Sequence, residues 1–499
     1  MNHGGALLAV DQGTSSSRAI AFSTTGEILA IAQHSFEQIY PRPGWVEQDP
    51  EILVATTVDS IREVLDRLRE LDIAVIALGL TNQRETTVAW NRRTGKAVCN
   101  ALSWQDRRTA DVCRRLVERG EEERLFSRTG LRLDPYFSAS KMAWILQNVP
   151  EAREMAFRGE LVLGTIDSFL IARLTNGAAH LTDASNASRT ALYDICSGRW
   201  DAELCGVFDV PVHCLADVRD CAGEFAMTEP SVLGGRIPIT GVAGDQHAAL
   251  IGQAGLREGD VKSTYGTGAF LMLNTGERFV RSGRRLLTTI AYRIAGRTTY
   301  ALEGSVLSAG ATVQWLRDGL GLFERAEDIE RLANSVPDSA GVYLVPAFTG
   351  LGAPYWEPDA RGAIVGLTRS SNRAHLARAG LDSVAFQTRD LLDAMRADGV
   401  APASLKVDGG MARNGLLLQR LADILDVPIQ RPRVVEATAW GAACLAGVGA
   451  GVYASLEDTG ALWCAEASYV PKLDAETRQG QLDGWHDALR AVIGQGPQR

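Results

Sequence analysis

The chain has 499 residues, which favours two or more domains, and its 46% hydrophobic and 22% charged content is typical of a soluble globular protein. A net charge of −9 argues against nucleic-acid binding through bulk charge. We find neither a secretory-type leader nor an apolar run of membrane-spanning length, so we expect a cytoplasmic protein with no integral membrane segment. The eight Cys lack Cys-x-x-Cys spacing, and we expect them to be reduced thiols.

The first motif is the polar turn 11–18 (DQGTSSSR), which follows a predicted strand at 6–10 and precedes strands at 19–22 and 28–32. Small residues let a backbone approach phosphate oxygens closely, hydroxyls add donors, and Arg18 adds charge. Asp11 ends the strand and is a candidate Mg²⁺ ligand. An ordinary Ser-rich hairpin turn remains the alternative.

The second motif is 81–87 (TNQRETT), after a helix predicted from Pro50 to about residue 70 and a buried strand at 73–80. Arg84 donates and Glu85 accepts hydrogen bonds, so the pair suits neighbouring hydroxyls of a polyol at a strand end. A surface ion pair is the alternative. Trp104 and Tyr136 are candidate pocket walls, although an aromatic residue taken singly more often serves core or surface packing.

Further on, we predict a helix within 134–144, a strand at 161–164, a helix at 165–174 and a polar loop at 181–190. A strand at 237–242 then leads through Gly244 to a short helix at 246–251. Asp245 is either a general base or a plain N-cap, and we expect it to stay ionised with ordinary acidity. We interpret His247 as structural.

The opening pattern recurs after a predicted hinge at 252–259. A strand at 261–265, the turn Gly266-Thr267-Gly268 and a strand at 269–273 echo residues 6–22. Two halves that begin alike suggest duplicated domains with a ligand between them, and Thr267 would be a second phosphate clamp. An isolated Gly-rich hairpin is the alternative.

The remainder contains a predicted helix at 305–316, with Gly310 and Gln314 on one face. It continues with a Gly/Pro-rich loop at 346–356, a helix at 375–396, a strand at 405–407 ending in Asp408-Gly409-Gly410, and helices at 414–425 and 436–447. The tail beyond 465 is polar and carries no recognised motif.

The order of these motifs over about residues 6–452 resembles the FGGY carbohydrate kinases of the actin-like ATPase superfamily. The Arg84-Glu85 segment, Trp104 and the 346–356 loop are the parts most specific to members that act on glycerol. The resemblance implies an α/β fold of two duplicated ribonuclease H-like (actin-like ATPase) domains with a central cleft. Residues 1–252 would hold the polyol site, the first phosphate turn and the base. Residues 253–499 would hold the nucleotide site, with a divergent tail from about 465.

The same resemblance implies roles for individual residues. The nucleotide would be bound by Thr14, Ser15, Ser16, Arg18, Thr267, Gly310, Gln314, Gly410 and Asn414. The polyol would be bound by Arg84, Glu85, Trp104, Tyr136, Asp245, Gln246 and Phe270. Asp11 and Asp245 would lie at Mg²⁺, and Asp245 would be the catalytic base. The chain departs from the family at Met411-Ala412-Arg413, where Ala-Asn-Asn is frequent.

The implied activity is ATP-dependent, Mg²⁺-assisted phosphorylation of glycerol to sn-glycerol 3-phosphate, by in-line transfer of the γ-phosphate. We also expect a homo-oligomer, a dimer or tetramer. A kinase for another small polyol or ketose is the first alternative, and a non-kinase actin-like ATPase the second. The Gly-x₄-Gly-Lys-Ser/Thr loop is absent, which excludes a P-loop kinase.

Overall fold

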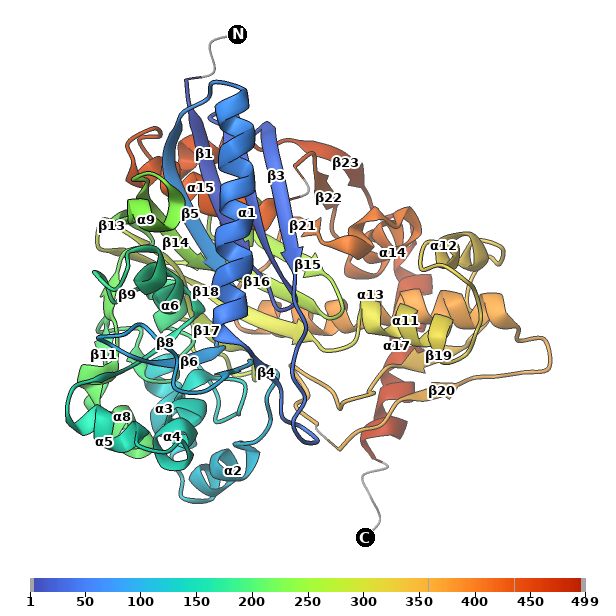
Figure 1. Cartoon of the computed structure of the whole chain (residues 1–499). Coiled ribbons are helices and arrows are strands. Elements are labelled where there is room, and N and C mark those ends of the chain that lie inside the picture. The colour runs from blue at the N-terminus through green and yellow to red at the C-terminus, as the bar shows by residue number, and fades with distance from the viewer. Residues whose placement is uncertain (1–3, 358, 435, 495–499) are drawn as a thin grey trace.

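Two mixed β-sheets form the frame of the molecule (Figure 1). The computed structural model describes residues 4–494 except 358 and 435. The first sheet has the order β13-β14-β5-β1-β2-β3, with β1 (Ala6–Gln12), β2 (Ser16–Ser23), β3 (Ile28–Ser35), β5 (Val75–Asn82), β13 (Ala222–Met227) and β14 (Pro238–Gly244). The second has the order β17-β18-β16-β15-β21-β22-β23, with β15 (Val261–Tyr265), β16 (Ala269–Gly276), β17 (Leu287–Ile294), β18 (Arg297–Val306), β21 (Leu405–Asp408), β22 (Ile429–Pro432) and β23 (Ala465–Tyr469).

The two sheets repeat one strand pattern. In the first, β1, β2 and β3 form an antiparallel meander, β5 and β14 continue parallel to β1, and β13 is an antiparallel edge. In the second, β15, β16 and β18 form the meander, β21 and β22 continue in parallel, and β23 is the antiparallel edge. The repeat confirms the predicted α/β fold of two duplicated ribonuclease H-like units.

Strand β1 is apolar along almost its whole length because both of its faces are covered. Leu8 and Val10 belong to the core under helix α1 (Pro50–Glu70), whereas Leu7 and Ala9 belong to a second core that contains residues of helix α15 (Ala437–Gly449). A strand buried on both sides cannot show the alternation of a half-exposed strand. The apolar residues of β1 therefore pack against helices on both faces of the first sheet, with α1 on one face and α15 on the other.

Two equivalent helices, α10 (Asp245–Gly252) after β14 and α15 after β22, cross between the sheets. A Cβ on Gly252 would lie 1.9 Å from the Ala437 carbonyl oxygen, and a Cβ on Gly441 would lie 1.8 Å from the Ala248 carbonyl oxygen. Only glycine allows backbones to approach so closely. Helix α15 thereby joins the end of the chain to its first sheet.

Other elements surround this frame. A smaller sheet, β4-β7-β6-β8, lies below the first in Figure 1. It comprises β4 (Glu47–Gln48), β6 (Thr87–Asn91), β7 (Ala101–Leu102) and β8 (Leu161–Thr165), and helices α2 (Ala110–Glu118), α3 (Glu122–Thr129), α4 (Ser138–Asn148), α5 (Ala152–Phe157), α6 (Ile166–Leu174) and α8 (Ala202–Phe208) accompany it. Helices α11 (Gly310–Asp318), α12 (Asp328–Ala333), α13 (Arg373–Ala397), α14 (Gly415–Leu425) and α17 (Ala475–Ile493) belong to the second half.

The prediction of a loop at 181–190 is wrong. These residues form strand β9 (Leu181–Asp183) and the short helix α7 (Ala184–Ala187), and all ten are buried. The polar side chains satisfy one another, since Asp183 accepts hydrogen bonds from the backbone N–H groups of Ser185 and Asn186. A polar segment is buried here because its groups find internal partners.

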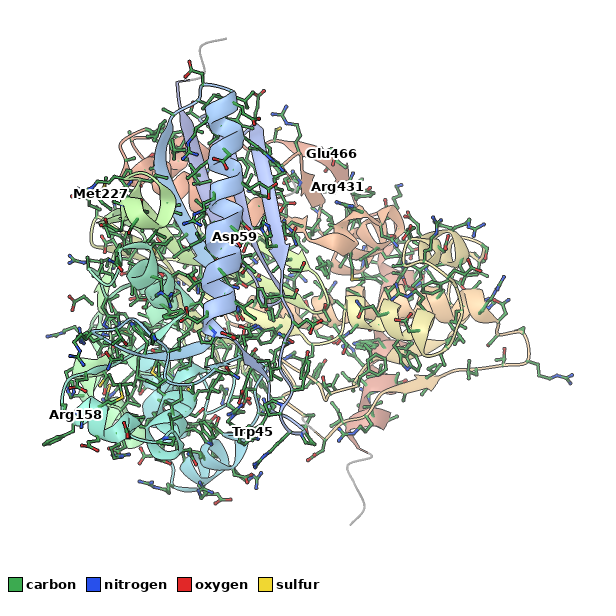
Figure 2. The ribbon with its side chains drawn as sticks, in the orientation of Figure 1. Trp45, Asp59, Arg158, Met227, Arg431 and Glu466 are labelled. Atoms are coloured by element: carbon green, nitrogen blue, oxygen red, sulfur yellow. The ribbon has the colours of Figure 1, made fainter. Side chains whose placement is uncertain are left out.

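One other expectation also changes, and the tail, for which no element was predicted, has a defined place in the fold. The helix predicted at 305–316 begins only at Gly310, because residues up to Val306 pair with β16. The polar tail is an integral part of the second half: β23 joins the sheet, and the fully buried Trp485 of α17 stacks on Phe386 of α13 with centroids 5.4 Å apart. An ion pair of 3.0 Å between Arg431 and Glu466, both labelled in Figure 2, links β22 to β23.

All eight Cys are free thiols. Across 4–494, leaving aside 358 and 435, none of the helices has the length and apolar character needed to span a bilayer.

Candidate functional site

Arg84 and Glu85 lie in the turn between β5 and β6, and both are almost fully buried rather than on the surface. Glu85 has φ of 62°, a left-handed conformation that costs energy for a residue with a side chain. The turn is fixed by hydrogen bonds to the Glu85 carbonyl oxygen from the hydroxyls of Ser138 (3.0 Å) and Thr87 (3.1 Å). A strained, buried, charged turn at a strand end indicates a functional site.

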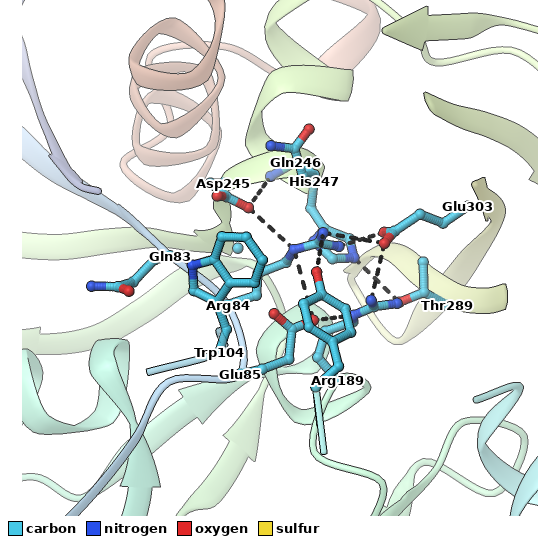
Figure 3. Close-up of polar contacts among 12 residues, drawn as sticks. Gln83, Arg84, Glu85, Trp104, Arg189, Asp245, Gln246, His247, Thr289 and Glu303 are labelled. Atoms are coloured by element: carbon cyan, nitrogen blue, oxygen red, sulfur yellow. Dashed lines mark hydrogen bonds and ion pairs between the residues drawn. The ribbon is translucent and has the colours of Figure 1, made fainter. Parts of the chain in front are cut away.

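Arg84 is the centre of a polar cluster (Figure 3). Its Nε lies 3.1 Å from Oδ1 of Asp245, its Nη2 donates to Oε1 of Glu303 at 3.2 Å, and its Nη1 donates to Oε2 of the same carboxylate. Nη2 also lies 3.4 Å from the Tyr136 hydroxyl. Burial lowers the pKa of Arg84, but Glu303 and the other neighbouring acidic groups outweigh it and raise the pKa well above its usual value.

Aromatic rings from both halves adjoin this cluster. Trp104 makes edge contacts with Tyr136, at 5.7 Å between centroids, and with Phe270 of β16, at 6.4 Å. The Trp104 indole N–H donates to Oγ1 of Thr14 at 3.0 Å. Trp104 therefore connects the predicted polyol residues directly to the predicted phosphate turn.

Asp245 is the first residue of α10, and Gly244 is the N-cap, so the plain N-cap interpretation of Asp245 does not hold. Its Oδ1 accepts from the Gln246 N–H at 2.6 Å, and its side chain remains 30% exposed. The expectation of ordinary acidity is also wrong: burial raises the pKa of Asp245, although Arg84 counteracts part of the rise. The neighbouring Gln246 carboxamide oxygen accepts a hydrogen bond from Lys262.

The first phosphate turn joins β1 and β2 and is closed by a 2.9 Å bond from the Gly13 N–H to the Ser16 carbonyl. Ser15 is exposed, whereas Thr14 and Ser16 are half-buried. Arg18 forms an ion pair with Glu436, just before α15. The predicted phosphate-binding side chains thus occupy one hairpin, and its arginine reaches the second half of the chain.

The carboxyl group of Asp11 is suited to bind a cation. Burial raises its pKa to about 7, and the nearby charges of Asp245 and Glu436 raise it further against the opposing effect of Arg18. A divalent cation favours the charged form of such a group. In the described part of the chain, no group of three or more His, Cys, Asp or Glu side chains has the arrangement of a metal centre. Asp11 and Asp245 remain predicted Mg²⁺ residues.

The second phosphate turn, 266–268, lies against the start of α11. The Gly310 N–H donates to the Gly266 carbonyl at 2.9 Å, the Ala309 N–H donates to the Thr267 carbonyl at 3.0 Å, and a Cβ on Gly310 would lie 2.5 Å from the Gly266 oxygen. Gln314, one turn further along α11, is exposed. Thr267 and Gly310, both predicted to bind the nucleotide, therefore lie close together.

The Asp408-Gly409-Gly410 segment is adjacent, because β21 pairs with β15. Gly409 has φ of 88°, and a Cβ there would lie 2.5 Å from the Tyr265 carbonyl oxygen. Gly410 is exposed. Asn414 is the N-cap of α14, and its carboxamide oxygen accepts from the Leu417 N–H at 2.9 Å, so only its NH₂ group is free to contact a nucleotide.

Sequence reasoning missed three buried charged residues of the cluster: Arg189, Lys262 and Glu303. Arg189 donates through Nε to Glu85 Oε1 at 2.7 Å and through Nη2 to Glu303 Oε1 at 3.0 Å. Lys262 lies in β15 and Glu303 in β18, and both side chains are buried, where an unpaired charge would be unstable. A charged residue inside the strand predicted at 261–265 was the available signal for Lys262.

Lys141 was missed as well. Its buried ammonium donates to the carbonyl oxygens of Pro135 (2.6 Å), Tyr136 (2.7 Å) and Phe137 (3.2 Å) and so holds the segment that presents the Tyr136 ring. Burial lowers the pKa of Lys141 to about 8. His247 agrees with its structural interpretation, since it is buried and its Nε2 lies 3.2 Å from the Thr289 hydroxyl.

A cleft of about 900 Å³ lies between the start of α1, the residues that follow β6 and the end of α6. Its lining includes Trp90, Arg92, Lys96 and Arg173, and it contains none of the residues predicted from the sequence to bind a ligand. The predicted site is instead the polar cluster and the two Gly-Thr turns.

The duplicated ribonuclease H-like fold, in which a Gly-Thr turn follows the first strand of each half, places the protein in the class with the actin-like ATPase fold. The chain belongs to the FGGY family of carbohydrate kinases: residues 6–252 match the N-terminal domain of that family and residues 261–450 match the C-terminal domain. Curated relatives include a glycerol kinase of Cereibacter sphaeroides, 53% identical over 99% of this chain and 100% of the relative. Glycerol kinase 1 of Pseudomonas aeruginosa is 54% identical over 97% of this chain and 98% of the relative.

Solved structures of kinases have the same fold as this chain. The glycerol kinase of Plasmodium falciparum with ADP superposes with a TM-score of 0.93 at 35% identity and covers 98% of each chain. A ligand-bound xylulose kinase from Lactobacillus acidophilus superposes with a TM-score of 0.88 at 21% identity, covering 98% of this chain and 99% of the other, and that similarity shows the fold alone.

Proposed function

We propose that the protein transfers the γ-phosphate of ATP to a terminal hydroxyl of glycerol and forms sn-glycerol 3-phosphate. The observation that carries the proposal is the cluster of Arg84, Asp245 and Tyr136, together with the Trp104 ring that contacts both Tyr136 and Phe270. Curated relatives named glycerol kinases at 53–54% identity over nearly the whole chain support the same acceptor.

The acceptor pocket suits a short polyol. Each hydroxyl both donates and accepts, and Arg84, Glu85 and Gln246 offer donors and acceptors within one small cluster. Because Lys262 donates to the Gln246 carboxamide oxygen, the Gln246 NH₂ group is the part left to donate to a hydroxyl. The aromatic faces of Trp104 and Phe270 suit the carbon chain.

The phosphate groups of ATP would be held by Thr14, Ser15, Ser16 and Arg18 on one side and Thr267 on the other. Gly310, Gln314, Gly410 and Asn414 would line the remainder of the nucleotide site. Asp11 and Asp245 are the carboxylates suited to Mg²⁺, and the raised pKa of Asp11 supports this fit. Bound Mg²⁺ would neutralise phosphate charge.

Asp245 is the proposed general base. Its carboxylate, held by Arg84 and the Gln246 N–H, would accept the proton of the attacking hydroxyl. Most of the rate enhancement in phosphoryl transfer comes from positioning and charge neutralisation. The fixed Arg84 guanidinium and the two phosphate turns are the groups of this chain that would supply it.

The proposal is tested by ADP release from Mg-ATP without acceptor and with glycerol, dihydroxyacetone, erythritol, xylulose or ribulose. We expect strong turnover with glycerol, weaker turnover with dihydroxyacetone and little with the longer acceptors. Preference for a longer acceptor would instead assign the chain to another polyol or ketose. Equal release without acceptor would indicate an actin-like ATPase that is not a kinase. The homo-oligomeric state and the cytoplasmic location stay predictions.

A further inference from the structure

The cluster around Arg84 contains two charged residues that none of the roles above uses, Arg189 and Glu303 (Figure 3). Both side chains are essentially buried, with exposed fractions of 0% and 2%. They come from different parts of the fold: Glu303 from β18 in the second sheet, and Arg189 from the segment after α7. Each contacts a residue of the predicted acceptor site.

Glu303 controls the orientation of Arg84. Both carboxylate oxygens of Glu303 accept hydrogen bonds from the two terminal nitrogens of Arg84, a bidentate geometry that fixes the plane of the guanidinium. With that plane fixed, Arg84 Nε is held 3.1 Å from Asp245. Burial disfavours the Glu303 charge, but Arg189 and Arg84 outweigh it and lower the pKa of Glu303 to about 2, so the carboxylate is ionised at neutral pH.

Arg189 holds Glu85 through one of its two carboxylate oxygens. Its Nε donates to Glu85 Oε1 at 2.7 Å, while its Nη2 donates to Glu303 Oε1 at 3.0 Å, so one guanidinium spans both carboxylates. Among the described residues, the side-chain contacts of the Glu85 carboxylate with Arg189 and Arg84 are made by Oε1, which leaves Oε2 for a ligand hydroxyl.

The backbone that carries Arg189 is itself fixed to three strands that end at the site. The side chains of Asn186 and Asn82 of β5 exchange two hydrogen bonds of 3.1 Å. The Gly244 N–H of β14 donates to Ser185 at 3.0 Å, and the Ser188 hydroxyl lies 2.8 Å from that of Thr289 in β17. The buried polar segment 181–190 therefore sets the position of Arg189 relative to Arg84 and Asp245.

We propose that Glu303 and Arg189 are positioning residues of the acceptor site: they hold Arg84 and Glu85 in the geometry that binds the polyol, so that acceptor affinity depends on a carboxylate of the second sheet. The inference rests on the proposed function, because it assigns these residues to the acceptor rather than to the nucleotide. A buried ionic network is weak evidence for stability, since a well-packed apolar core is often equally stable.

The test compares Glu303→Gln, which keeps the shape and removes the charge, with Arg189→Lys, which keeps the charge and removes the planar fork. We expect each to raise KM for glycerol by about 10- to 100-fold while KM for Mg-ATP changes less than about twofold. Calorimetric Kd values for glycerol provide a readout independent of turnover. The matched control is Asp382→Asn, which breaks the buried 2.7 Å pair with Arg420 away from the site and should leave KM for glycerol unchanged.

A double-mutant cycle separates positioning from general destabilisation. If Glu303 acts through Arg84, then Glu303→Gln adds little to KM for glycerol in an Arg84→Lys background, whereas independent effects would multiply. Unchanged KM in folded Glu303→Gln, multiplying effects, or an equal rise in KM for Mg-ATP would each overturn the inference. If Glu303→Gln does not fold, Arg189→Lys replaces it in the test. A double-mutant cycle of Arg189→Lys with Glu85→Gln then shows whether Arg189 acts through Glu85.

Failure of the proposed function is a separate result. If the wild-type protein does not phosphorylate glycerol, the acceptor assignment is wrong whatever the variants do. If it does phosphorylate glycerol and the variants bind glycerol normally, only the positioning roles of Glu303 and Arg189 are wrong.

Discussion

At the scale of single residues, the candidate site depends on burial more than on residue type. Arg84 and Glu85 are adjacent opposite charges of a kind common on surfaces, yet here both are buried and their pKa values are raised. Asp245 combines a half-exposed side chain with a firm ion pair to Arg84. A carboxylate held in this way is oriented for a proton transfer.

Replacing Asp245 with Asn keeps the shape of the side chain and removes the proposed base. We expect kcat to fall by about 10²- to 10⁴-fold while binding of a non-hydrolysable ATP analogue survives. Initial rates and calorimetric binding measure the two effects. Glu224→Gln, at an exposed carboxylate away from the site, is the control and should have wild-type kcat. Near-normal turnover in Asp245→Asn would reject the base assignment.

The acidity of Asp245 predicts a pH dependence. The proposed base, Asp245, would work only when deprotonated, and burial raises its pKa, so kcat/KM for the acceptor should fall with decreasing pH at values above the ordinary range of Asp. Arg84 lowers this pKa, so Arg84→Gln should move the acidic limb to higher pH. Profiles of kcat/KM from pH 5 to pH 9 test the sign, and a limb that stays fixed or moves to lower pH would contradict it.

At the scale of elements, polar contacts decide which segments become part of the core. The segment 181–190 is buried because its side chains cap α7 and bond to β5, β14 and β17. Helix α17 is attached in a comparable way: Trp485 Nε1 donates to Asp390 Oδ2 at 2.8 Å, and His486 Nε2 lies 3.2 Å from Asp390 Oδ1.

The His486 contact makes the docking of α17 dependent on pH. The hydrogen bond to Asp390 raises the pKa of His486, so the charged form stabilises the fold at pH below the ordinary His value, and this stability is lost as pH rises through the raised pKa. His486→Gln should therefore lower the free energy of unfolding more at pH 5.5 than at pH 8.5. The difference should stay below about 1 kcal/mol because solvent screens a side chain that is 41% exposed.

Urea unfolding at the two pH values measures this difference. His213→Gln is the matched control, because exposed His213 contacts the Ala156 carbonyl rather than a carboxylate. Equal losses of stability at both pH values in His486→Gln would refute the linkage.

At the scale of the whole molecule, contacts between the halves assemble the candidate site. Trp104 touches Phe270, and Arg84 pairs with Glu303. The crossing of α10 and α15 is the closest backbone approach among these connections. The relative position of the two sheets therefore depends on glycines that are not among the predicted ligand-binding residues.

Gly441→Ala should test this crossing. The new Cβ would lie 1.8 Å from the Ala248 carbonyl oxygen, so the helices must separate, and we expect a loss on the order of 2 kcal/mol or more in the free energy of unfolding. Gly480→Ala in α17, where a Cβ meets open space, is the control and should be neutral or stabilising by up to about 1 kcal/mol. Thermal and urea unfolding of both variants measure the change in the free energy of unfolding. Similar values for Gly441→Ala and Gly480→Ala would contradict the close helix crossing.

Local patterns predicted much of the fold and part of the candidate site. The apolar run at 6–10, the Pro50 helix start and the repeated strand–turn–strand opening all depend on neighbouring residues, and each has its expected element. Arg84, Glu85, Tyr136 and Asp245 were also recognised, because polar groups at strand and helix ends are visible in the sequence.

The amino-acid sequence by itself was enough to predict the duplicated α/β fold, because the repeated strand–turn–strand opening and the order of the motifs resemble a known family. Only the tertiary structure decided that Glu303 of the second sheet contacts Arg84 of the first half, and that Arg189 spans Glu85 and Glu303. These contacts join residues more than 100 positions apart, and the polarity of a segment says nothing about such partners. Burial of a charge depends on whether the folded chain brings an opposite charge to it.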